Sequence, residues 1–179
     1  MIDIRRKIFR KYPTTRKLLL PTRYVDIREI DEDKEITNCL SEIKETYYLA
    51  NQYQFLARFC KQNSITDMEL SIESYRNYDH EIFNFIAHNL SDRKEDKYKL
   101  IDRNYVSDFE NKIYELFQYF KFPVIHLTKI EMKEYAHKLG FDDILMMTWF
   151  CATPWRGKPC GFCGPCTTAI KMGLSNRIP

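Results

Sequence analysis

Four cysteines close to the C-terminal end have the residue type and the spacing of a metal site. The pattern is C-x8-C-x2-C-x2-C, and its members are Cys151, Cys160, Cys163 and Cys166. The two short intervals let adjacent thiolates meet at one ion, and the long interval lets the first cysteine return to complete the shell. Four protein ligands leave no open position for a reactive water, so the pattern predicts structural zinc.

The residues around these cysteines fit such a site. Gly161 and Gly164 each follow a predicted ligand, where the chain must turn tightly and direct its N–H groups at sulfur. Cys166 is expected to open a final helix from Thr167 to about Met172, whose positive N-terminus would lower the pKa of the thiol. Three basic residues are near enough in sequence to offset the charge of a tetrathiolate: Arg156, Lys158 and Lys171.

Two alternatives remain open for the same cysteines. Disulfides are one, but a reducing compartment favours metal ligation over disulfides. An iron–sulfur cluster is the other, because C-x2-C-x2-C also occurs in ferredoxin-type sites. There the fourth cysteine usually lies downstream and is often followed by proline, whereas here Cys151 lies upstream and precedes Ala152. The sequence therefore favours zinc.

Composition indicates a globular chain rather than a disordered or membrane-spanning one. Of 179 residues, 44% are hydrophobic and 15% aromatic, which is enough for one sizeable domain with a small appendage. No run approaches the roughly 18 apolar residues of a membrane span. The basic N-terminus has only Leu18 to Leu20 where a signal peptide has its apolar core, so we expect a cytoplasmic protein.

Hydrophobic periodicity predicts alternating helices and strands. The expected helices cover residues 2–11, 34–63, 79–90 and 106–120, the expected strands 68–72 and 122–127, and a charged loop 91–97. Thr128 to Glu131 has the sequence of a capping box, and Gly140 can end the helix that follows it. Strand, turn and capped helix in succession predict an α/β domain with a mostly parallel sheet.

The distribution of glycine excludes the common phosphate-binding loops from most of the chain. The five glycines are Gly140, Gly157, Gly161, Gly164 and Gly173, so none lies in the first 139 residues. A loop that cradles phosphate needs close backbone approach and positive φ, which glycine supplies. We therefore expect no P-loop and no glycine-rich dinucleotide turn before the cysteines.

Charge and composition divide the sequence into three segments. Residues 1–33 form a basic lead-in, residues 34–147 an α/β half-domain, and residues 148–179 the four-cysteine tail. The first 23 residues hold eight basic side chains against one acidic residue, Asp3. Such a segment is either a solvated lead-in or a patch that faces an anionic partner, and the overall charge of +3 does not decide between them.

Several other residues allow two interpretations each. Trp149 and Trp155 flank the cysteine loop, where they either shield the metal or offer a surface on which a heterocycle stacks. Asp142 and Asp143 can cap a helix as readily as they can do chemistry.

The stretch from Phe122 to Leu174 resembles the C-terminal end of the 7-cyano-7-deazaguanine synthases, enzymes of queuosine biosynthesis in the PP-loop ATP pyrophosphatase superfamily. The resemblance rests on the strand and capped helix from Phe122 to Glu131, on Thr148 to Cys151, on Cys160 to Cys166, and on Met172 to Leu174. It implies a partial Rossmann-like sheet of the PP-loop type, carrying a zinc-binding knuckle.

That family uses ATP to convert 7-carboxy-7-deazaguanine to the nitrile, a ligase-type reaction. The resemblance implies that the four cysteines bind zinc and that Lys129 and Glu131 contact substrate, although a capping box with a surface lysine explains this pair equally well. The family's Ser-Gly-Gly-x-Asp-Ser loop is missing here, so we expect no catalysis by this chain alone.

Three explanations of the missing loop remain open: a truncated protein, a split enzyme, or a descendant that kept the fold and the zinc for binding. We expect either a homo-oligomer or a second subunit that carries the ATP-binding half. The alternative is a non-enzymatic zinc module that binds protein or nucleic acid through the basic N-terminal segment. No membrane partner is expected.

Overall fold

The computed structural model describes residues 1–74, 81–88 and 108–178. It divides into two compact units: unit 1 combines Met1–Arg23 with Lys129–Pro179, and unit 2 is Tyr24–Thr128. The predicted boundaries after residues 33 and 147 fall inside these two units, so the three-part division of the sequence stays a prediction. No described helix has the length and apolar character needed to cross a membrane.

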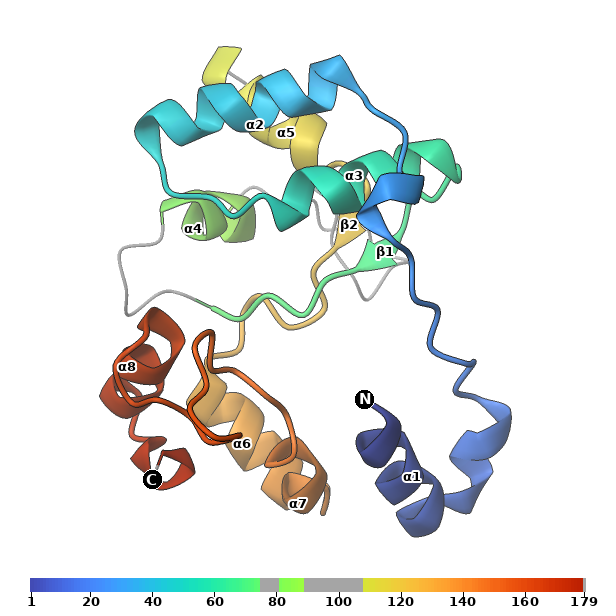
Figure 1. Ribbon diagram of the computed structural model, residues 1–179, viewed down its shortest axis with the longest axis vertical. Helices are drawn as coiled ribbons and strands as arrows, with labels where there is room; N and C mark the ends of the chain where they lie inside the picture. Colours follow the sequence, from blue (N-terminus) through green and yellow to red (C-terminus); the bar gives the residue numbers. More distant parts are fainter. Residues whose placement is uncertain (75–80, 89–107, 179) are drawn as a thin grey trace. The chain divides into compact units, whose positions relative to one another are not determined.

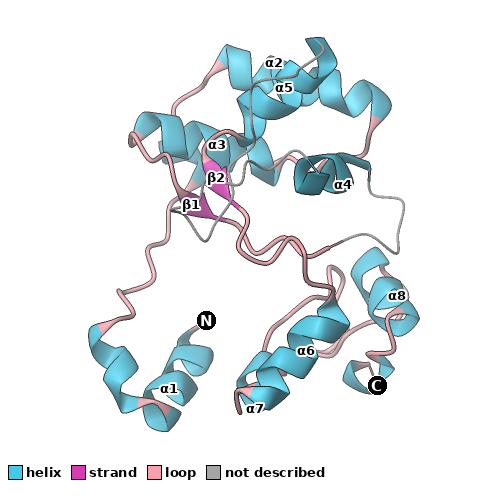
Figure 2. Cartoon of the chain, turned by 180° about the vertical axis from the view of Figure 1, so that it is seen from behind, coloured by secondary structure: helices cyan, strands magenta, loops and turns pink. Residues whose placement is uncertain are grey.

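Unit 2 packs helices around a small parallel sheet (Figure 1). Its elements are η2 (Ile27–Glu29), α2 (Lys34–Thr46), α3 (Gln52–Gln62), β1 (Met68–Glu69), α4 (Glu81–His88), α5 (Asp108–Phe117) and β2 (Phe120–Lys121). Met68 pairs with Phe120 and Glu69 with Lys121, and Figure 2 shows the two strands side by side. Parallel strands need a long crossover, and the chain between these two includes α4 and α5. The described residues thus form a mainly helical fold with a two-stranded parallel sheet, which confirms part of the predicted α/β architecture.

An aromatic cluster forms the core of unit 2. Phe117 is fully buried, and its ring lies 5.3 Å from that of Tyr53, 6.0 Å from that of Phe120 and 6.2 Å from that of Phe83. Tilted and edge-to-face rings at these separations attract one another beyond the effect of area burial. Around them pack aliphatic side chains of α2, α4 and α5, so that residues distant in sequence share one core.

The prediction of one helix over residues 34–63 is wrong. The first helix begins after Asp33, whose carboxylate accepts a hydrogen bond from the Ile36 amide at 3.0 Å, and it ends at Thr46. The chain then turns, leaving Tyr48 87% exposed and Leu49 2% exposed, before α3 starts. An unbroken 30-residue helix would be about 45 Å long and could not pack both halves on α5. Burial in the shared core therefore outweighs the continuous helical pattern.

The strand predicted over residues 122–127 is also wrong, because this segment forms consecutive turns. The amide of Ile125 donates to the carbonyl of Phe122 at 3.4 Å, and that of Leu127 donates to the carbonyl of Val124 at 2.9 Å. Pro123 has no N–H to offer a neighbouring strand. The strand instead occupies Phe120, the last residue of the helix expected over residues 106–120, and Lys121.

Unit 1 contains shorter helices with little apolar burial. Its elements are α1 (Ile2–Lys11), η1 (Pro13–Lys17), α6 (Lys129–Lys138), α7 (Asp142–Leu145), α8 (Gly164–Lys171) and η3 (Ser175–Arg177). No residue of α1 is buried, and the helix is held to α7 by polar contacts. Lys7 and Lys11 contact the carboxylate of Asp143 at 2.9 and 2.6 Å, and the hydroxyl of Tyr12 donates to the Gly140 carbonyl at 3.0 Å.

Asp143 takes part in ion pairs with two lysines of the N-terminal helix. Hydrogen bonds from Lys11 and Lys7 lower the pKa of Asp143 to about 2. A carboxylate with a lowered pKa stabilises the fold above its ordinary pKa of about 4, and its contribution is lost as the pH falls toward 2. The attachment of α1 is thus strongest at neutral pH.

Several local predictions are confirmed. The helix expected over residues 2–11 matches α1, and Gly140 ends α6 with the left-handed φ of +72°. The helix expected over residues 79–90 is present in its described part, and that expected over residues 106–120 is present but ends at Phe117. The predicted loop at residues 91–97 lies outside the described residues.

The aromatic core makes one residue a sensitive test of unit 2. We expect Phe117→Ala to lower the free energy of unfolding by about 3–5 kcal/mol, because it removes a fully buried ring that touches several others. Tyr48→Ala is the matched control, since that ring is exposed, and its effect should stay within about 0.5 kcal/mol. Urea unfolding followed by far-ultraviolet circular dichroism measures the free energy of unfolding of both variants. Equal effects would contradict this assignment of the core.

Candidate metal centre

The structure brings the four predicted cysteines of unit 1 together. Their Sγ atoms all lie within 4.8 Å of one another, and no other such group of potential metal ligands occurs among the described residues. The Sγ atoms of Cys151 and Cys163 are 3.8 Å apart, and those of Cys160 and Cys166 are 4.0 Å apart. These separations are far above the roughly 2.05 Å of a disulfide bond, and all six cysteines are free. The four thiols could therefore hold a metal ion.

The four cysteines come from the segments before α8 and from its first turn. Cys151 follows the irregular segment after α7, and Cys160 and Cys163 lie in the loop that leads to α8. Cys163 occupies the N-cap position of α8, which begins at Gly164, so Cys166 lies within the first turn of this helix. The sequence predicted the final helix correctly but began it at residue 167. Cys151 and Cys166 are buried, whereas Cys160 and Cys163 are half-buried.

Backbone amides point at the sulfurs, as they do in tight metal-binding turns. The amide of Cys160 donates to the Sγ of Cys151, and the amide of Cys163 donates to the Sγ of Cys160, both at 3.3 Å. The hydroxyl of Thr153 contacts the Sγ of Cys160 at the same distance. Donors of this kind stabilise thiolates, which are the form that binds metal.

A hairpin closes the eight-residue excursion between Cys151 and Cys160. Trp155 and Lys158 exchange two backbone hydrogen bonds, of 3.0 and 2.9 Å. Arg156 and Gly157 between them both have positive φ, +46° and +74°, which is the backbone of a two-residue type I′ turn. This turn reverses the chain so that Cys160 returns to Cys151.

The two glycines predicted to turn the chain behave differently. Gly161 has φ of +81°, a conformation that L residues avoid. Gly164 opens α8 with no positive φ, and nothing would meet a Cβ added there. Only Gly161 therefore needs the conformational freedom of glycine.

The thiols of the cluster differ in their pKa values. Burial raises the pKa of Cys163, but the amides of Ala152 and Cys166 and the neighbouring thiols outweigh burial and lower this pKa to about 6. Burial also opposes ionisation of Cys160, yet the Thr153 hydroxyl and backbone amides lower its pKa.

Cys166 behaves in the opposite way. Burial, with the surrounding thiols, raises the pKa of Cys166 to about 12, against the effect expected from a helix N-terminus. Four adjacent thiols cannot all become thiolates unless a cation compensates their charge.

Two further cysteines lie in unit 2 and have the character of buried thiols. Burial, with a hydrogen bond from the Cys39 thiol to Glu115 at 2.9 Å, raises the pKa of Cys39 to about 12. Burial also raises the pKa of Cys60 to about 11. Both therefore stay protonated at neutral pH and are poor metal ligands.

The pair Lys129 and Glu131 lies on α6, outside the cysteine cluster. Lys129 lines a shallow pocket of about 150 Å³ in unit 1, which Glu131 does not line; the other lining residues are Met132, Lys133, Leu145, Met146, Thr148, Leu174 and Arg177. Arg177 was not predicted from the sequence. Its guanidinium donates to the Thr148 carbonyl and lies 4.7 Å above the Phe150 ring, which ties the last residues to the start of the cysteine segment.

Both tryptophans that flank the loop are exposed. Trp149 is 56% exposed, Trp155 is 71% exposed, and Phe162 between two cysteines is 74% exposed. The indole N–H of Trp149 donates to the Cys151 carbonyl at 2.8 Å, so its polar edge is engaged while much of its ring faces solvent.

Comparison of this chain with family models, with curated proteins and with solved structures found no match in any of the three searches.

The two glycines of the loop provide a matched pair of variants. We expect Gly161→Ala to cost about 1–2 kcal/mol through its positive φ, which corresponds to a loss of metal affinity of roughly tenfold. Gly164→Ala should leave affinity unchanged, because alanine suits the first turn of a helix and meets no neighbour there. Competition with a chromophoric chelator measures both, and equal affinities for the two variants would refute the geometry of the loop.

Proposed function

We propose that this chain is a zinc-binding protein related to the C-terminal, metal-carrying part of the 7-cyano-7-deazaguanine synthases. The observation that carries the proposal is the convergence of four Sγ atoms within 4.8 Å, at the spacing of that family's zinc motif. The proposal includes a Rossmann-like ancestry for the α/β part, which the parallel pairing of β1 and β2 supports at the level of two strands.

The sulfur geometry suits a single zinc ion. A tetrahedron with Zn–S bonds of about 2.3 Å has edges of about 3.8 Å. The pairs Cys151–Cys163 and Cys160–Cys166 lie at 3.8 and 4.0 Å, close to this edge. An iron–sulfur cluster distributes its four thiolates over several iron atoms and so needs them further apart. The sulfur distances therefore favour a single ion.

The charge of the surrounding chain also supports zinc. Four thiolates around a divalent ion leave a charge of −2. Residues 148–179 contain no Asp or Glu, and their basic residues are Arg156, Lys158, Lys171 and Arg177. The segment thus supplies compensating charge without a competing carboxylate ligand. With four protein ligands, the role of the metal is to hold the fold.

The proposed relation to an ATP-dependent enzyme does not extend to independent catalysis. A triphosphate is commonly held by converging backbone N–H groups at a glycine-bearing turn. No glycine precedes Gly140, and four of the five glycines have positive φ in a helix end or in the metal segment. We therefore propose that ATP chemistry, where this chain takes part in it, needs a second subunit that carries the phosphate loop.

Metal analysis tests the zinc assignment. Protein purified without added metal should contain about one zinc per chain and show no absorbance near 400 nm, because Zn²⁺ has no visible transitions. A brown protein with stoichiometric iron and sulfide would refute zinc.

The ligand set is tested by a pair of cysteine variants. Cys163→Ser should lower metal affinity by more than about 100-fold, beyond the range caused by changes around a ligand. Cys39→Ser is the control, since serine can also donate to Glu115 and Cys39 lies in unit 2, and it should keep full zinc content.

Calorimetry tests the proposed dependence on a partner. The zinc-loaded chain alone should give no heat of binding with ATP and magnesium, and it should release no pyrophosphate with 7-carboxy-7-deazaguanine and ammonia. Micromolar ATP binding by the single polypeptide would contradict the argument from the glycines. Activity that appears only after a subunit with the PP-loop is added would support a split enzyme.

A further inference from the structure

Charge is distributed very unevenly between the two units. Unit 1 has 15 basic and 5 acidic residues, a formal charge of +10, whereas unit 2 has 13 basic and 20 acidic residues, a formal charge of −7. The small net charge of the whole chain therefore conceals a strongly basic body. A charge excess of this size attracts polyanions at long range.

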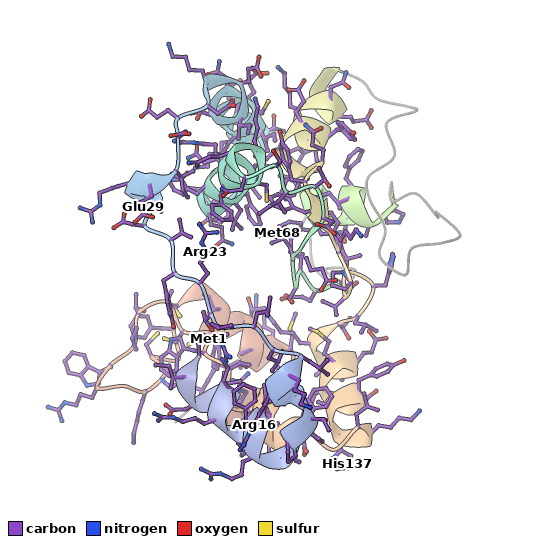
Figure 3. All side chains as sticks on the ribbon, turned by 90° about the vertical axis from the view of Figure 1, so that its right-hand side faces the viewer. Met1, Arg16, Arg23, Glu29, Met68 and His137 are labelled. Carbon is purple, nitrogen blue, oxygen red and sulfur yellow. The ribbon has the colours of Figure 1, made fainter. Side chains whose placement is uncertain are left out.

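Exposed basic residues occur in both parts of unit 1. In the N-terminal part, Arg10, Arg16 and Lys17 are exposed, and Figure 3 labels Arg16 on this segment. In the metal loop, Arg156 and Lys158 are exposed on either side of Gly157. Lys7 and Lys11, by contrast, form ion pairs with Asp143.

Exposed aromatic rings accompany the cations of the metal loop. Trp155 is 71% exposed and Phe162 is 74% exposed, although large apolar rings are usually withdrawn from water. The guanidinium of Arg156 lies 5.8 Å from the Trp155 ring centroid. A ring with a cation over one face suits a nucleotide, because the other face can stack on a base while the cation pairs with a phosphate.

The geometry of the loop holds these rings ready for a ligand. Phe162 lies next to Cys163 in the cluster, and Trp155 stands at the base of the type I′ turn through Arg156 and Gly157. The cysteine cluster and the hairpin thus fix where the backbone presents both rings. A preorganised surface loses little conformational entropy on binding.

We infer that the metal loop of unit 1 binds single-stranded nucleic acid, with bases stacked on Trp155 and Phe162 and phosphates paired with Arg156 and Lys158. Duplexes fit less well, because their bases are already stacked, and no element of the loop is a long helix or ribbon that would read a groove. The inference relies on the proposed metal only for the rigidity of the loop.

Fluorescence anisotropy of the zinc-loaded full chain with labelled oligothymidylate and oligouridylate tests the inference. We expect binding that weakens as salt rises, and weaker binding of a duplex of equal length. Trp155→Ala and Phe162→Ala should each lower affinity about tenfold, as expected for the loss of one stacked base. Arg156→Ala should make the slope of log affinity against log salt concentration less steep, by about the amount that one phosphate contact contributes.

Matched controls separate stacking from charge and from folding. Tyr48→Ala removes an equally exposed ring from the acidic unit and should not change affinity. Heparin has charge without bases, so its binding should be insensitive to Trp155→Ala. The aromatic variants should retain the same metal content as the unchanged chain, so that a lower affinity for nucleic acid cannot result from loss of the metal. The inference is overturned if no oligonucleotide binds at low salt, or if zinc-loaded Trp155→Ala and Phe162→Ala bind as tightly as the unchanged chain.

Discussion

The mutual repulsion of four neighbouring thiolates is the constraint on which the C-terminal segment depends. Only a cation lets all four ionise together, and in the structure the competition appears as a lowered pKa at Cys163 and a raised pKa at Cys166. The segment has little else to hold it, since its other buried side chains are Ala169, Met172 and Leu174. An apolar core this small is not enough to stabilise a fold in water, whereas metal binding can supply the missing free energy of folding.

The same constraint shapes the charge of the segment. A tetrathiolate around a divalent ion is anionic. The surrounding chain can offset this charge, because it donates N–H···S hydrogen bonds and contains four basic residues and no acidic one. Two of these cations stand on the hairpin beside an exposed indole. The requirement to neutralise a metal centre and the capacity to attract a polyanion thus arise from the same side chains, and the proposed metal and the inferred ligand share one electrostatic origin.

Sequence reasoning succeeded where a structural feature depends on nearby residues. The spacing of the cysteines predicted their convergence, and Gly140 predicted the end of α6. It failed where contacts between residues distant in sequence determine the local structure. Leu49 interrupts a continuous helical pattern because it enters a core shared with α4 and α5, which no local periodicity reveals. Likewise Phe120 belongs to a strand only because Met68 pairs with it, and Phe162 stays exposed although its residue type predicts burial.

The two units are therefore stabilised by different physical means. Unit 2 has an aromatic and aliphatic core that needs no ligand, and its cysteines remain protonated thiols because burial disfavours their charge. Unit 1 has few buried side chains, an N-terminal helix attached by ion pairs, and four clustered cysteines that could hold a metal ion. Burial opposes ionisation of cysteine in both units. In unit 2 the thiols therefore stay protonated, whereas in unit 1 a bound cation would compensate the charge, and burial would then strengthen the bond between thiolate and metal.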